Sequence, residues 1–593
     1  MIIKRQMFQI MIEDRNYSQW TIIDVQTGKN IVKIESDSPK WKEFHPIKEK
    51  LFTKDIFSLE ERGDKETYDI HIVSSQVKES IEMPGVLILE NNKTFGRTEN
   101  KKRLLYKCIP DDKRLPAFLI PYEIKMGFSK VNKNKYVTFK FDKWKDTHPQ
   151  GLLVQTIGNV EDIEAFYEYQ LYCRSLHISI TKFINKTRET IEKKPTPERI
   201  SQICNNPHFT INDRRNQDYI FTIDPQGSSD FDDALSIRKM ENGDWKISVY
   251  IANVYLWLET FNLWNSFSTR VATIYLPDRR RPMLPTILSE LMCSLQKQED
   301  RFAFVMDVLI DSNGNVVENS LTFSNALICV EQNYVYEDPQ MIATDENYIQ
   351  LLELTRRMDA TTENSHDVVS FWMVFMNKSC GDFMALNKFG IFRSSTYFDT
   401  MKNENIQDNI SYDIKDDTKR IIKMWNNSSG QYILYNDEEG IEHVIMDVKS
   451  YVHITSPIRR LVDLLNQMLM IEKFGLITNM SKEAAAFLSS WLENIDYINV
   501  SMRSIRKIQT DCQLVERCFK TPDIMKIEHT GVVFDKLKKT DNTYSYMVYL
   551  EDIKLLSRIS CKMDVLNYSK NQFKLYLFED EDKIKNKIRL SIV

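Results

Sequence analysis

Hydrophobic and polar positions form short runs over the first part of the chain. Apolar segments at residues 85–89 and 117–120 are separated by polar turns, and residues 135–141 alternate apolar and basic side chains with period two. Alternation of this kind indicates a half-exposed strand. Several short strands with turns between them predict a small β-barrel over residues 81–165. Residues 1–80 mix apolar runs with charges, and we expect a partial β-barrel there at most.

The spacing of apolar residues becomes helical further along the chain. Residues 162–194 show this spacing until Pro195 and Pro197 close it, so we place a helical connector at 166–204. Residues 205–520 form the largest block and mix strands with longer helices. The strands are expected at 219–223 and 245–252, and the helices at 347–358, 368–386, 458–474 and 482–516.

The last part of the chain, residues 523–593, returns to short strands. These are expected at 544–550, 573–578 and 588–593. The whole pattern predicts a multidomain α+β protein, in which a central mixed α/β domain is flanked by small β-barrels. A chain of 593 residues is too long for one hydrophobic core, which agrees with several domains.

Composition excludes some classes of protein. With 42% hydrophobic and 27% charged residues, the chain is an ordinary globular protein, neither disordered nor fibrous. The net charge of −5 shows no global basic excess, so a site for a polyanion must come from local clusters of Lys and Arg. No run of about 18 apolar residues is present, which excludes a membrane span. The nine cysteines lack metal-type spacing and are expected to be free thiols, so we expect an intracellular protein. Of the intracellular compartments, we expect the cytoplasm rather than the nucleus.

The first candidate site is a cluster of four aspartates, Asp224, Asp230, Asp232 and Asp233. Asp224 ends a predicted strand, and Gly227 allows an irregular loop that folds the later aspartates back towards it. Carboxylates packed together are electrostatically costly unless cations or protons neutralise them. Oxygen-only ligands favour Mg²⁺ or Mn²⁺ over zinc. Two such ions about 4 Å apart can activate a water and stabilise the leaving oxygen of a phosphodiester.

Two other interpretations of this cluster stay open. An acidic loop is commonly a solvated surface turn. A calcium loop between two helices is the other possibility, but counting from Asp224 as the first ligand puts Leu235 at the closing position, where a bidentate Glu is required. The calcium interpretation is therefore weak.

A second motif stands at residues 451–460, Tyr-Val-His-Ile-Thr-Ser-Pro-Ile-Arg-Arg. Pro457 after Ser456 is a good helix start, which predicts that Arg459 and Arg460 lie in the first helical turn. Backbone N–H groups favour an anion at that place, and arginine forks grip phosphate. Alone, such a string is commonly an incidental helix cap. Together with the aspartates of the same domain, it suggests a phosphate clamp.

At these two motifs the chain resembles the RNase II/RNase R family, which includes the catalytic exonuclease subunit of the eukaryotic exosome. Residues 223–234 resemble the active-site signature of that family, and residues 451–460 resemble its second signature. Between them, further strings follow the family pattern in order: Tyr275-Leu276-Pro277, Met283-Leu284-Pro285, Leu288-Ser289 and Cys293-Ser294-Leu295. Residues 85–90 and 109–118 are similar to the cold-shock barrel of exosome-type members. The resemblance covers residues 83–593, and we expect no counterpart of the exosome-type N-terminal nuclease domain.

The resemblance implies a catalytic domain that threads single-stranded RNA through a narrow channel. OB-type barrels would lie above its mouth, cold-shock-like on the N-terminal side and S1-like on the C-terminal side. RNA would enter 3′ end first and be hydrolysed to nucleoside 5′-monophosphates. Asp224 and Asp233 would hold one Mg²⁺, with Mn²⁺ as a substitute. Asp230 and Asp232 would complete the site for a second ion and the attacking water.

Further residues are candidates for binding RNA. By resemblance, Arg459 would hold the scissile phosphate and Tyr275 would stack on a base, although a tyrosine in such a string could equally pack in the core. The other predicted contacts are Arg279, Arg280, Ser456, Arg460, Lys135 and Tyr136. Aromatic and basic residues also mix at 133–144 and 574–589, as in proteins that bind single strands, with core packing as the alternative.

Several positions depart from the family pattern. The family has Ala-Asp at Ala252-Asn253, two acidic residues at Ser370-Phe371, Tyr at Leu461 and often His at Gln467. None of these positions is a predicted metal ligand. The departures therefore bear on RNA handling, processivity and product length.

The sequence thus supports the hypothesis of a monomeric, processive, Mg²⁺-dependent 3′→5′ exoribonuclease that acts on single-stranded RNA and not at membranes. Membership of an RNA-decay complex stays open. One alternative is an inactive relative that binds single-stranded RNA. Another is a metal-dependent phosphodiesterase acting on DNA or small nucleotides, which substrate competition would discriminate.

Overall fold

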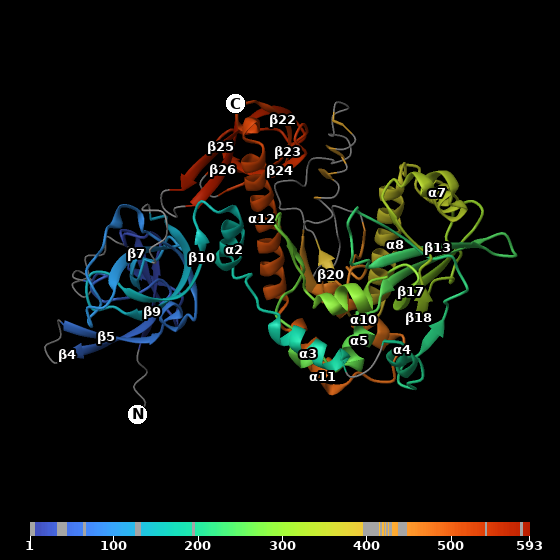
Figure 1. Ribbon diagram of the computed structural model, residues 1–593, viewed down its shortest axis with the longest axis horizontal. Coiled ribbons are helices and arrows are strands. Elements are labelled where there is room, and N and C mark those ends of the chain that lie inside the picture. The colour runs from blue at the N-terminus through green and yellow to red at the C-terminus, as the bar shows by residue number, and fades with distance from the viewer. Residues whose placement is uncertain are drawn as a thin grey trace.

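The protein is described by a computed structural model. It covers residues 6–32, 44–62, 67–124, 132–192, 196–394, 430–436, 448–539, 542–580 and 585–593, with a few separate residues between 414 and 425. The chain runs from an N-terminal sheet through a closed barrel and a large central domain to a C-terminal sheet (Figure 1). The expected multidomain α+β architecture is confirmed.

The N-terminal sheet has the strand order β3-β2-β1-β4-β5. Its strands are β1 (Met7–Ile12), β2 (Trp20–Asp24), β3 (Asn30–Val32), β4 (Ile56–Arg62) and β5 (Thr67–Ser74), and the short helix α1 (Gln76–Glu79) follows. Strand β1 alternates half-buried and buried positions, so Phe8, Ile10 and Ile12 enter the core. This period of two places one face of β1 in the core, and β1 is the central strand of the sheet.

A closed barrel follows, with the strand order β10-β8-β7-β6-β9. Its strands are β6 (Met83–Leu87), β7 (Leu104–Pro110), β8 (Phe118–Tyr122), β9 (Lys135–Lys143) and β10 (Gln150–Asn159). A parallel pair between Gln150 and Leu119 closes the barrel. The prediction of a half-exposed β9 is wrong for residues 136–139, which are all buried. One reason is that a helix covers this strand from outside, where Tyr136 stacks on Tyr169.

Three helices connect the barrel to the central domain: α2 (Ile163–Cys173), α3 (Thr181–Ile191) and α4 (Thr196–Cys204). Asp162 begins α2, because its side chain accepts a hydrogen bond from the backbone N–H of Glu164 at 3.0 Å. The prediction that Pro197 closes the helical region is wrong. Pro197 lies in the first turn of α4, where its missing N–H costs nothing. Pro195 lies outside the described residues.

A seven-stranded sheet forms the centre of the molecule, with the order β11-β18-β17-β14-β13-β12-β19. Its strands are β11 (Ile211–Asp213), β12 (Phe221–Asp224), β13 (Asp233–Lys239), β14 (Trp245–Ala252), β17 (Asp300–Ile310), β18 (Thr322–Cys329) and β19 (Gln332–Val335). The two edge strands pair in parallel with their neighbours, and the inner pairs are antiparallel. Strands β14 and β17 are buried along almost their whole length, so both faces of the sheet are covered there.

The larger helices of this region are α5 (Val254–Thr260), α6 (Pro339–Thr344), α7 (Glu346–Met358), α8 (Ser365–Leu386), α10 (Leu461–Lys473), α11 (Lys482–Leu492) and α12 (Ile495–Lys520). Two predictions are corrected. The helix expected at 458–474 begins at Leu461, because residues 457–459 form a turn. The helix expected at 482–516 is two helices, since α11 ends before α12 begins at Ile495. The remaining strands are two pairs: β15 (Ile274–Tyr275) with β16 (Arg280–Arg281), and β20 (Ile391–Ser394) with β21 (Gln431–Leu434).

The C-terminal sheet has the strand order β24-β23-β22-β25-β26. Its strands are β22 (His529–Lys538), β23 (Tyr544–Leu550), β24 (Leu555–Cys561), β25 (Lys570–Asp580) and β26 (Lys585–Ile592). In this sheet, as in the N-terminal sheet and the closed barrel, the first strand along the chain pairs with the second and the fourth. Three five-stranded units with one strand order are what OB-type modules would form.

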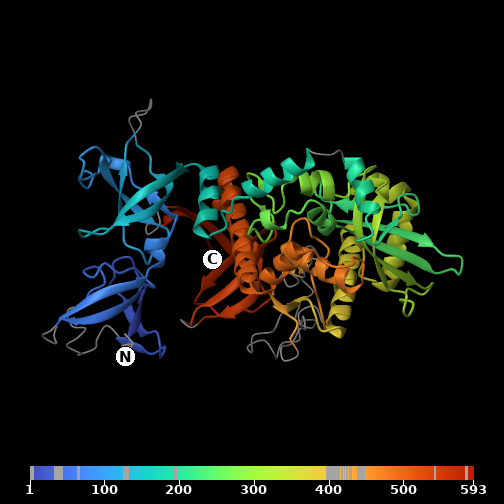
Figure 2. The same ribbon diagram turned by 90° about the horizontal axis from the view of Figure 1, so that it is seen from below.

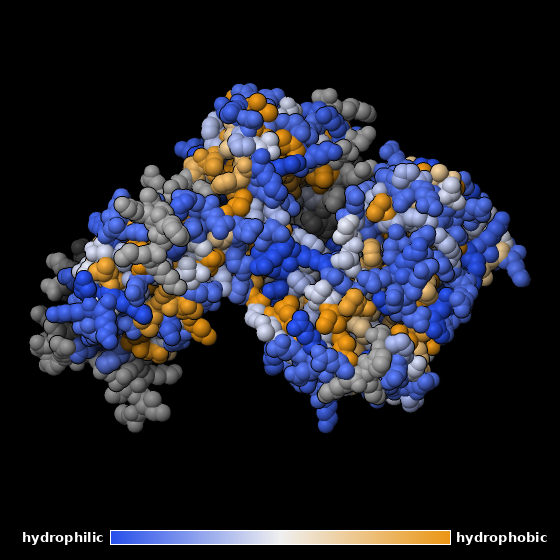
Figure 3. Space-filling model, in the orientation of Figure 1, coloured by the Kyte–Doolittle hydropathy of each residue, from blue (hydrophilic) through white to orange (hydrophobic). Residues whose placement is uncertain are grey.

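Figures 1 and 2 show how these units are arranged. The N-terminal sheet and the barrel lie at one end of the molecule, the seven-stranded sheet lies at the other, and the C-terminal sheet lies between them beside the long helix α12. The face seen in Figure 3 is mainly hydrophilic, with some apolar side chains exposed over the C-terminal sheet. Among the helices of the described ranges, none combines the length and apolar character needed to cross a bilayer.

Candidate active site

The four aspartates surround the loop that joins two neighbouring strands of the central sheet. Asp224 is the last residue of β12 and Asp233 is the first of β13. These strands pair antiparallel through Phe221 and Leu235, so their ends bring the two carboxyl groups together. Gly227 allows the turn between them, with a positive φ of 83° that other residues rarely adopt. The sequence prediction that the loop folds back towards Asp224 therefore agrees with the strand pairing.

Asp232 joins this loop to the second motif, 226 residues further along the chain. Its Oδ1 accepts a hydrogen bond from the backbone N–H of Ile458 at 2.9 Å, and its Oδ2 accepts one from Nε of Arg459 at 3.1 Å. The Asp232 side chain is only 2% exposed, whereas that of Arg459 is 46% exposed. Nη2 of Arg459 also donates to the hydroxyl of Ser456 at 3.1 Å. The guanidinium is thus held on one side and accessible on another.

The arginine pair stands before helix α10 and not in its first turn, which corrects the sequence prediction. Arg460 is the N-cap residue of α10. Oδ1 of Asp463 accepts hydrogen bonds from Nη2 of Arg460 and from the backbone N–H of Ser456, both at 2.8 Å. Asp463 is fully buried. This carboxylate therefore holds the turn closed, and Arg460 is part of the support of the turn.

Asp230 faces the small hairpin β15–β16. Nη1 of Arg280 donates to Oδ1 of Asp230 at 2.7 Å, and Nη2 donates to the hydroxyl of Ser229 at 2.8 Å. Arg280 also contacts Glu290. Tyr275 pairs with Arg280 across the hairpin and is 37% exposed. Burial, followed by the negative charge of Asp230, raises the pKa of the Tyr275 phenol to about 12.

Burial disfavours the charged form of three carboxylates of this site, those of Asp224, Asp232 and Asp233. The pKa of Asp232 is raised to about 7, first by burial, while Arg459 and the N–H of Ile458 oppose the rise. Burial also raises the pKa of both Asp224 and Asp233, and in Asp224 the neighbouring charge of Asp233 adds to it. Such a group of acids is stable when protonated or when a cation compensates its charge.

The residues present fit a divalent cation. Oδ2 of Asp224 is buried and has no hydrogen-bond partner, which is costly for a carboxylate oxygen unless an ion or a proton satisfies it. Carboxylate oxygens are ligands that suit Mg²⁺ and Mn²⁺. The described part of the chain nevertheless contains no group of three His, Cys, Asp or Glu side chains already arranged as a metal site. Arg280 and Arg459 form ion pairs with Asp230 and Asp232.

The other predicted RNA contacts lie outside this cluster. The side chain of Arg279 is 68% exposed and lies 3.5 Å from Glu168. Lys135 is half-buried and donates to Asn159 at 2.8 Å. Tyr136 is fully buried, with its ring 4.2 Å from that of Tyr169, so its predicted contact with RNA is corrected. Its aromatic and basic neighbours suggested a binding strand, and helix α2 covers it instead.

Sequence reasoning missed Tyr336 and His366. The backbone N–H of Tyr336 donates to the carbonyl of Asp224 at 3.0 Å, and its ring stacks on His366 with 3.6 Å between centroids. Burial, followed by the charges of Asp233 and Asp224, raises the pKa of the Tyr336 phenol. Tyr336 reaches the site because β19 pairs in parallel with β12. Only the sheet order reveals this, and no local motif marks it.

Two of the departures from the family pattern have structural roles. The side chain of Asn253 accepts from the N–H of Leu256 at 3.2 Å, which caps α5, and donates to Asn325 at 2.9 Å. Nε2 of Gln467 donates to the carbonyl of Ala252 at 3.0 Å. Both side chains are fully buried. Leu461 is the buried first residue of α10, while Ser370 is exposed and Phe371 half-buried on α8.

Comparison with known families identifies the class of protein. Residues 212–350 and 341–473 match the family described as the RNB domain, and residues 105–169 match the Dis3-like cold-shock domain 2 (CSD2). The chain belongs to the RNase II/R/Dis3 family of RNB-domain exoribonucleases and carries a Dis3-like cold-shock domain.

Curated relatives agree with this family. DIS3-like exonuclease 2 of Schizosaccharomyces pombe is 28% identical over 307 residues, which are 49% of this chain and 32% of that protein. Ribonuclease R of Aquifex aeolicus is 29% identical over 230 residues, 36% of this chain and 31% of that protein. The matched segments span less than a third of the length of each relative.

Solved structures share the fold across almost the whole chain. The apo form of Mycoplasma genitalium RNase R has a TM-score of 0.65 at 15% identity, covering 99% of this chain and 100% of that one. Yeast Ssd1, a pseudonuclease, has a TM-score of 0.54 at 14% identity, covering 96% and 80%. The fold is therefore shared by a nuclease and a pseudonuclease, so activity has to be argued from the site.

Proposed function

We propose that the chain is a processive, hydrolytic 3′→5′ exoribonuclease that degrades single-stranded RNA to nucleoside 5′-monophosphates. The observation that carries this proposal is the junction at Asp232, whose two carboxylate oxygens bind the backbone and the guanidinium of the Ile458–Arg459 turn. The junction brings a cluster of acids and an accessible arginine to one place. That combination suits a phosphodiester, which needs both cation-mediated and guanidinium-mediated charge compensation.

Asp224 and Asp233 are the residues that would hold a Mg²⁺ ion. Asp230 and Asp232 lie beside them and would complete the site for a second Mg²⁺ ion. Mn²⁺ would substitute for Mg²⁺ at these sites. A bound ion of this kind supplies a more acidic water and offsets charge on the phosphate. The buried, unpartnered oxygen of Asp224 supports this assignment. The raised pKa values of Asp224 and Asp233 support it too, because a cation would restore their charged forms.

Arg459 binds and orients the phosphate in this proposal. Its Nε and Nη2 are fixed by Asp232 and Ser456, so the guanidinium keeps one orientation, and its exposed side leaves room for a phosphate oxygen. Tyr275 stacks on a base near the 3′ end, and its exposure supports that role. Ser456, Arg460 and Arg280 act mainly by holding the turn and the hairpin, and Arg279 and Lys135 contact the RNA further out.

We also propose the domain division expected from the sequence. Residues 1–80 are the N-terminal region, 81–165 the cold-shock-like barrel, 166–204 the connector, 205–520 the catalytic domain and 523–593 the S1-like barrel. The partner is single-stranded RNA, bound by a monomer or within an RNA-decay complex. A Mycoplasma genitalium RNase R of the same fold has been solved with ribose-methylated single-stranded RNA, which supports the choice of partner.

The second candidate is a catalytically weak or inactive relative that binds single-stranded RNA. The ion pairs of Asp230 with Arg280 and of Asp232 with Arg459 favour it, because each occupies an oxygen that a metal would need. The fold shared with the pseudonuclease Ssd1 is compatible with it.

The chemistry is tested with RNA labelled at its 3′-terminal nucleotide, incubated with Mg²⁺ in phosphate-free buffer. The proposal expects the label to appear as a nucleoside 5′-monophosphate from the first time point, and DNA of the same sequence to stay intact. Labelled oligonucleotides would indicate internal cleavage and overturn the 3′→5′ assignment. Intact RNA that is nevertheless retarded on a native gel would favour the binding module.

A further inference from the structure

The hairpin β15–β16 has two different sides. Successive side chains of a strand point in opposite directions, so Arg280 and Arg281 on β16 leave the hairpin on opposite faces. Arg280 reaches Asp230 in the aspartate loop at 2.7 Å. Arg281 points away from that loop and is only 7% exposed. A contact that fixes Arg281 therefore also fixes β16, which presents Arg280 to the site and pairs with β15, the strand of Tyr275.

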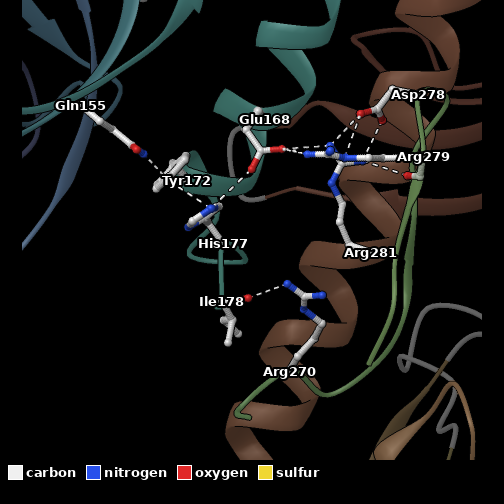
Figure 4. A network of polar contacts seen from close by, with 9 residues as sticks. All are labelled: Gln155, Glu168, Tyr172, His177, Ile178, Arg270, Asp278, Arg279 and Arg281. Carbon is white, nitrogen blue, oxygen red and sulfur yellow. Dashed lines mark hydrogen bonds and ion pairs between the residues drawn. The ribbon is translucent and has the colours of Figure 1, made fainter. Parts of the chain in front are cut away.

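Two carboxylates bind the buried guanidinium of Arg281. Asp278, in the turn of the same hairpin, accepts from Nη1 at 2.7 Å and from Nη2 at 2.8 Å. Glu168 accepts from Nη2 at 3.0 Å, and it comes from helix α2, more than a hundred residues earlier in the chain. Figure 4 shows Glu168 directed at the arginines of the hairpin. The ion pair between Arg281 and Asp278 is bidentate and buried, so the arginine has little freedom to move.

Glu168 is also linked to strand β10 of the cold-shock barrel through two intervening side chains. Its other oxygen lies 3.4 Å from Nε2 of His177. The same nitrogen is 3.1 Å from the hydroxyl of Tyr172, whose ring stacks on His177 with 3.9 Å between centroids. Gln155 on strand β10 donates to the Tyr172 hydroxyl. Figure 4 thus shows a continuous line of polar contacts from the barrel, through α2, to the hairpin.

A second set of hydrogen bonds also links the α2 region to the hairpin. Nη2 of Arg270 donates to the carbonyl of Ile178, after α2, at 2.5 Å, and Nη1 donates to the carbonyl of Pro282, after the hairpin, at 2.7 Å. Arg270 is 9% exposed. Arg281 and Pro282, at the end of β16, are therefore both held to the α2 region.

We propose that Glu168 is a positioning residue for the active site. By holding Arg281 from helix α2, it sets the place of the hairpin and thereby of Tyr275, on which the last bases of the RNA stack. This inference rests on the proposed function. Its physical basis is that a displacement of the order of 1 Å in a substrate-holding group lowers the rate about 100-fold.

The test compares Glu168→Gln with Glu164→Gln. Gln keeps the size of the side chain and one acceptor oxygen but loses the charge that binds Arg281. Glu164 is an exposed glutamate on the same helix and serves as the matched control. Hydrogen exchange of the RNA-free protein is measured for residues 274–281, and kcat and KM are measured on single-stranded RNA. In Glu168→Gln, we expect faster exchange in this segment and a kcat/KM at least tenfold lower; in Glu164→Gln, both stay as in the wild type.

A combined variant separates positioning from a merely structural role. If Glu168 acts through Tyr275, the loss caused by Glu168→Gln shrinks in a Tyr275→Ala background, because the two residues share one task. Equal losses in both backgrounds would overturn the proposal, as would unchanged exchange in Glu168→Gln. If the wild type binds RNA without cleaving it, the proposed function fails, and RNA affinity then replaces kcat/KM in the same comparison.

Discussion

Asp230 and Asp232 each form an ion pair with an arginine, whereas Asp224 is buried beside the negative charge of Asp233. The four aspartates are therefore not equivalent. A bound cation would stabilise the carboxylate of Asp224 most, because its Oδ2 has no hydrogen-bond partner. At Asp230 and Asp232, a ligand has to compete with, or rearrange, an existing ion pair. This difference is invisible in the sequence, where the four residues stand within one short string.

Tyr275 is the residue whose role is most directly separable from folding. Tyr275→Ala should weaken the binding of single-stranded RNA by about 1–3 kcal/mol, because it removes a ring on which a base stacks. Tyr275→Phe keeps the ring and should bind almost as the wild type does. Fluorescence anisotropy with labelled RNA in EDTA measures both without cleavage. Equal affinity of the Ala variant and the wild type would exclude stacking at this position.

At this scale, the sequence identified the acids and Arg459 through their motifs, and the structure brings Asp232 and Arg459 into contact. The sequence could not identify the partners of Arg280, Arg281 and Arg460, since each pairing depends on tertiary structure. The predicted RNA contact of Tyr136 is wrong, because a strand of basic and aromatic residues has the same sequence pattern whether RNA or a helix covers it.

Two strands rich in aromatic and β-branched residues were predicted best. Strands β14 (Trp245–Ala252) and β23 (Tyr544–Leu550) coincide with their predicted ranges. Helix α10 begins three residues later than the Ser-Pro signal suggests, because Asp232 and Asp463 accept backbone N–H groups of the preceding turn and hold it out of the helix. Local helix signals cannot include Asp232, an acceptor from a distant part of the chain.

The contact between β10 and α2 depends on one glycine. A Cβ at Gly158 would overlap the Cβ of Ala165 on α2. Gly158→Ala should therefore destabilise the protein by about 1–3 kcal/mol, as overpacking commonly does. Urea unfolding of the variant and of Gly158→Ala combined with Ala165→Gly measures the effect. We expect the combined variant to lose less stability than the sum of the two single changes, and additive losses would show that the two elements are not in contact at these positions.

At the scale of the whole molecule, the sequence predicted small barrels around a mixed central domain, and that architecture is confirmed. Short strands separated by turns are enough to predict this architecture from the sequence. The order of the seven-stranded sheet was not predictable, because β19 joins β12 and β11 joins β18 through parallel pairs between distant segments. The same order brings Tyr336 to Asp224 and explains why the sequence missed it.

The connector also has a structural role in the arrangement of the units. Helix α2 contacts the barrel through Tyr169 and the central domain through Glu168, so the two parts share one short helix. A barrel that guides RNA would then be held in a defined place relative to the hairpin at the aspartates.

The central claim is that RNA is hydrolysed at the aspartate cluster, and one time course tests it most directly. Single-stranded RNA labelled at its 5′ end is incubated with Mg²⁺ and the wild type, beside Asp232→Asn and a reaction in EDTA. The account predicts a short 5′-labelled product with the wild type alone, while Asp232→Asn still retards the RNA on a native gel. Cleavage by Asp232→Asn at the wild-type rate would contradict the assignment of the site, and binding without cleavage by the wild type would contradict the proposed activity.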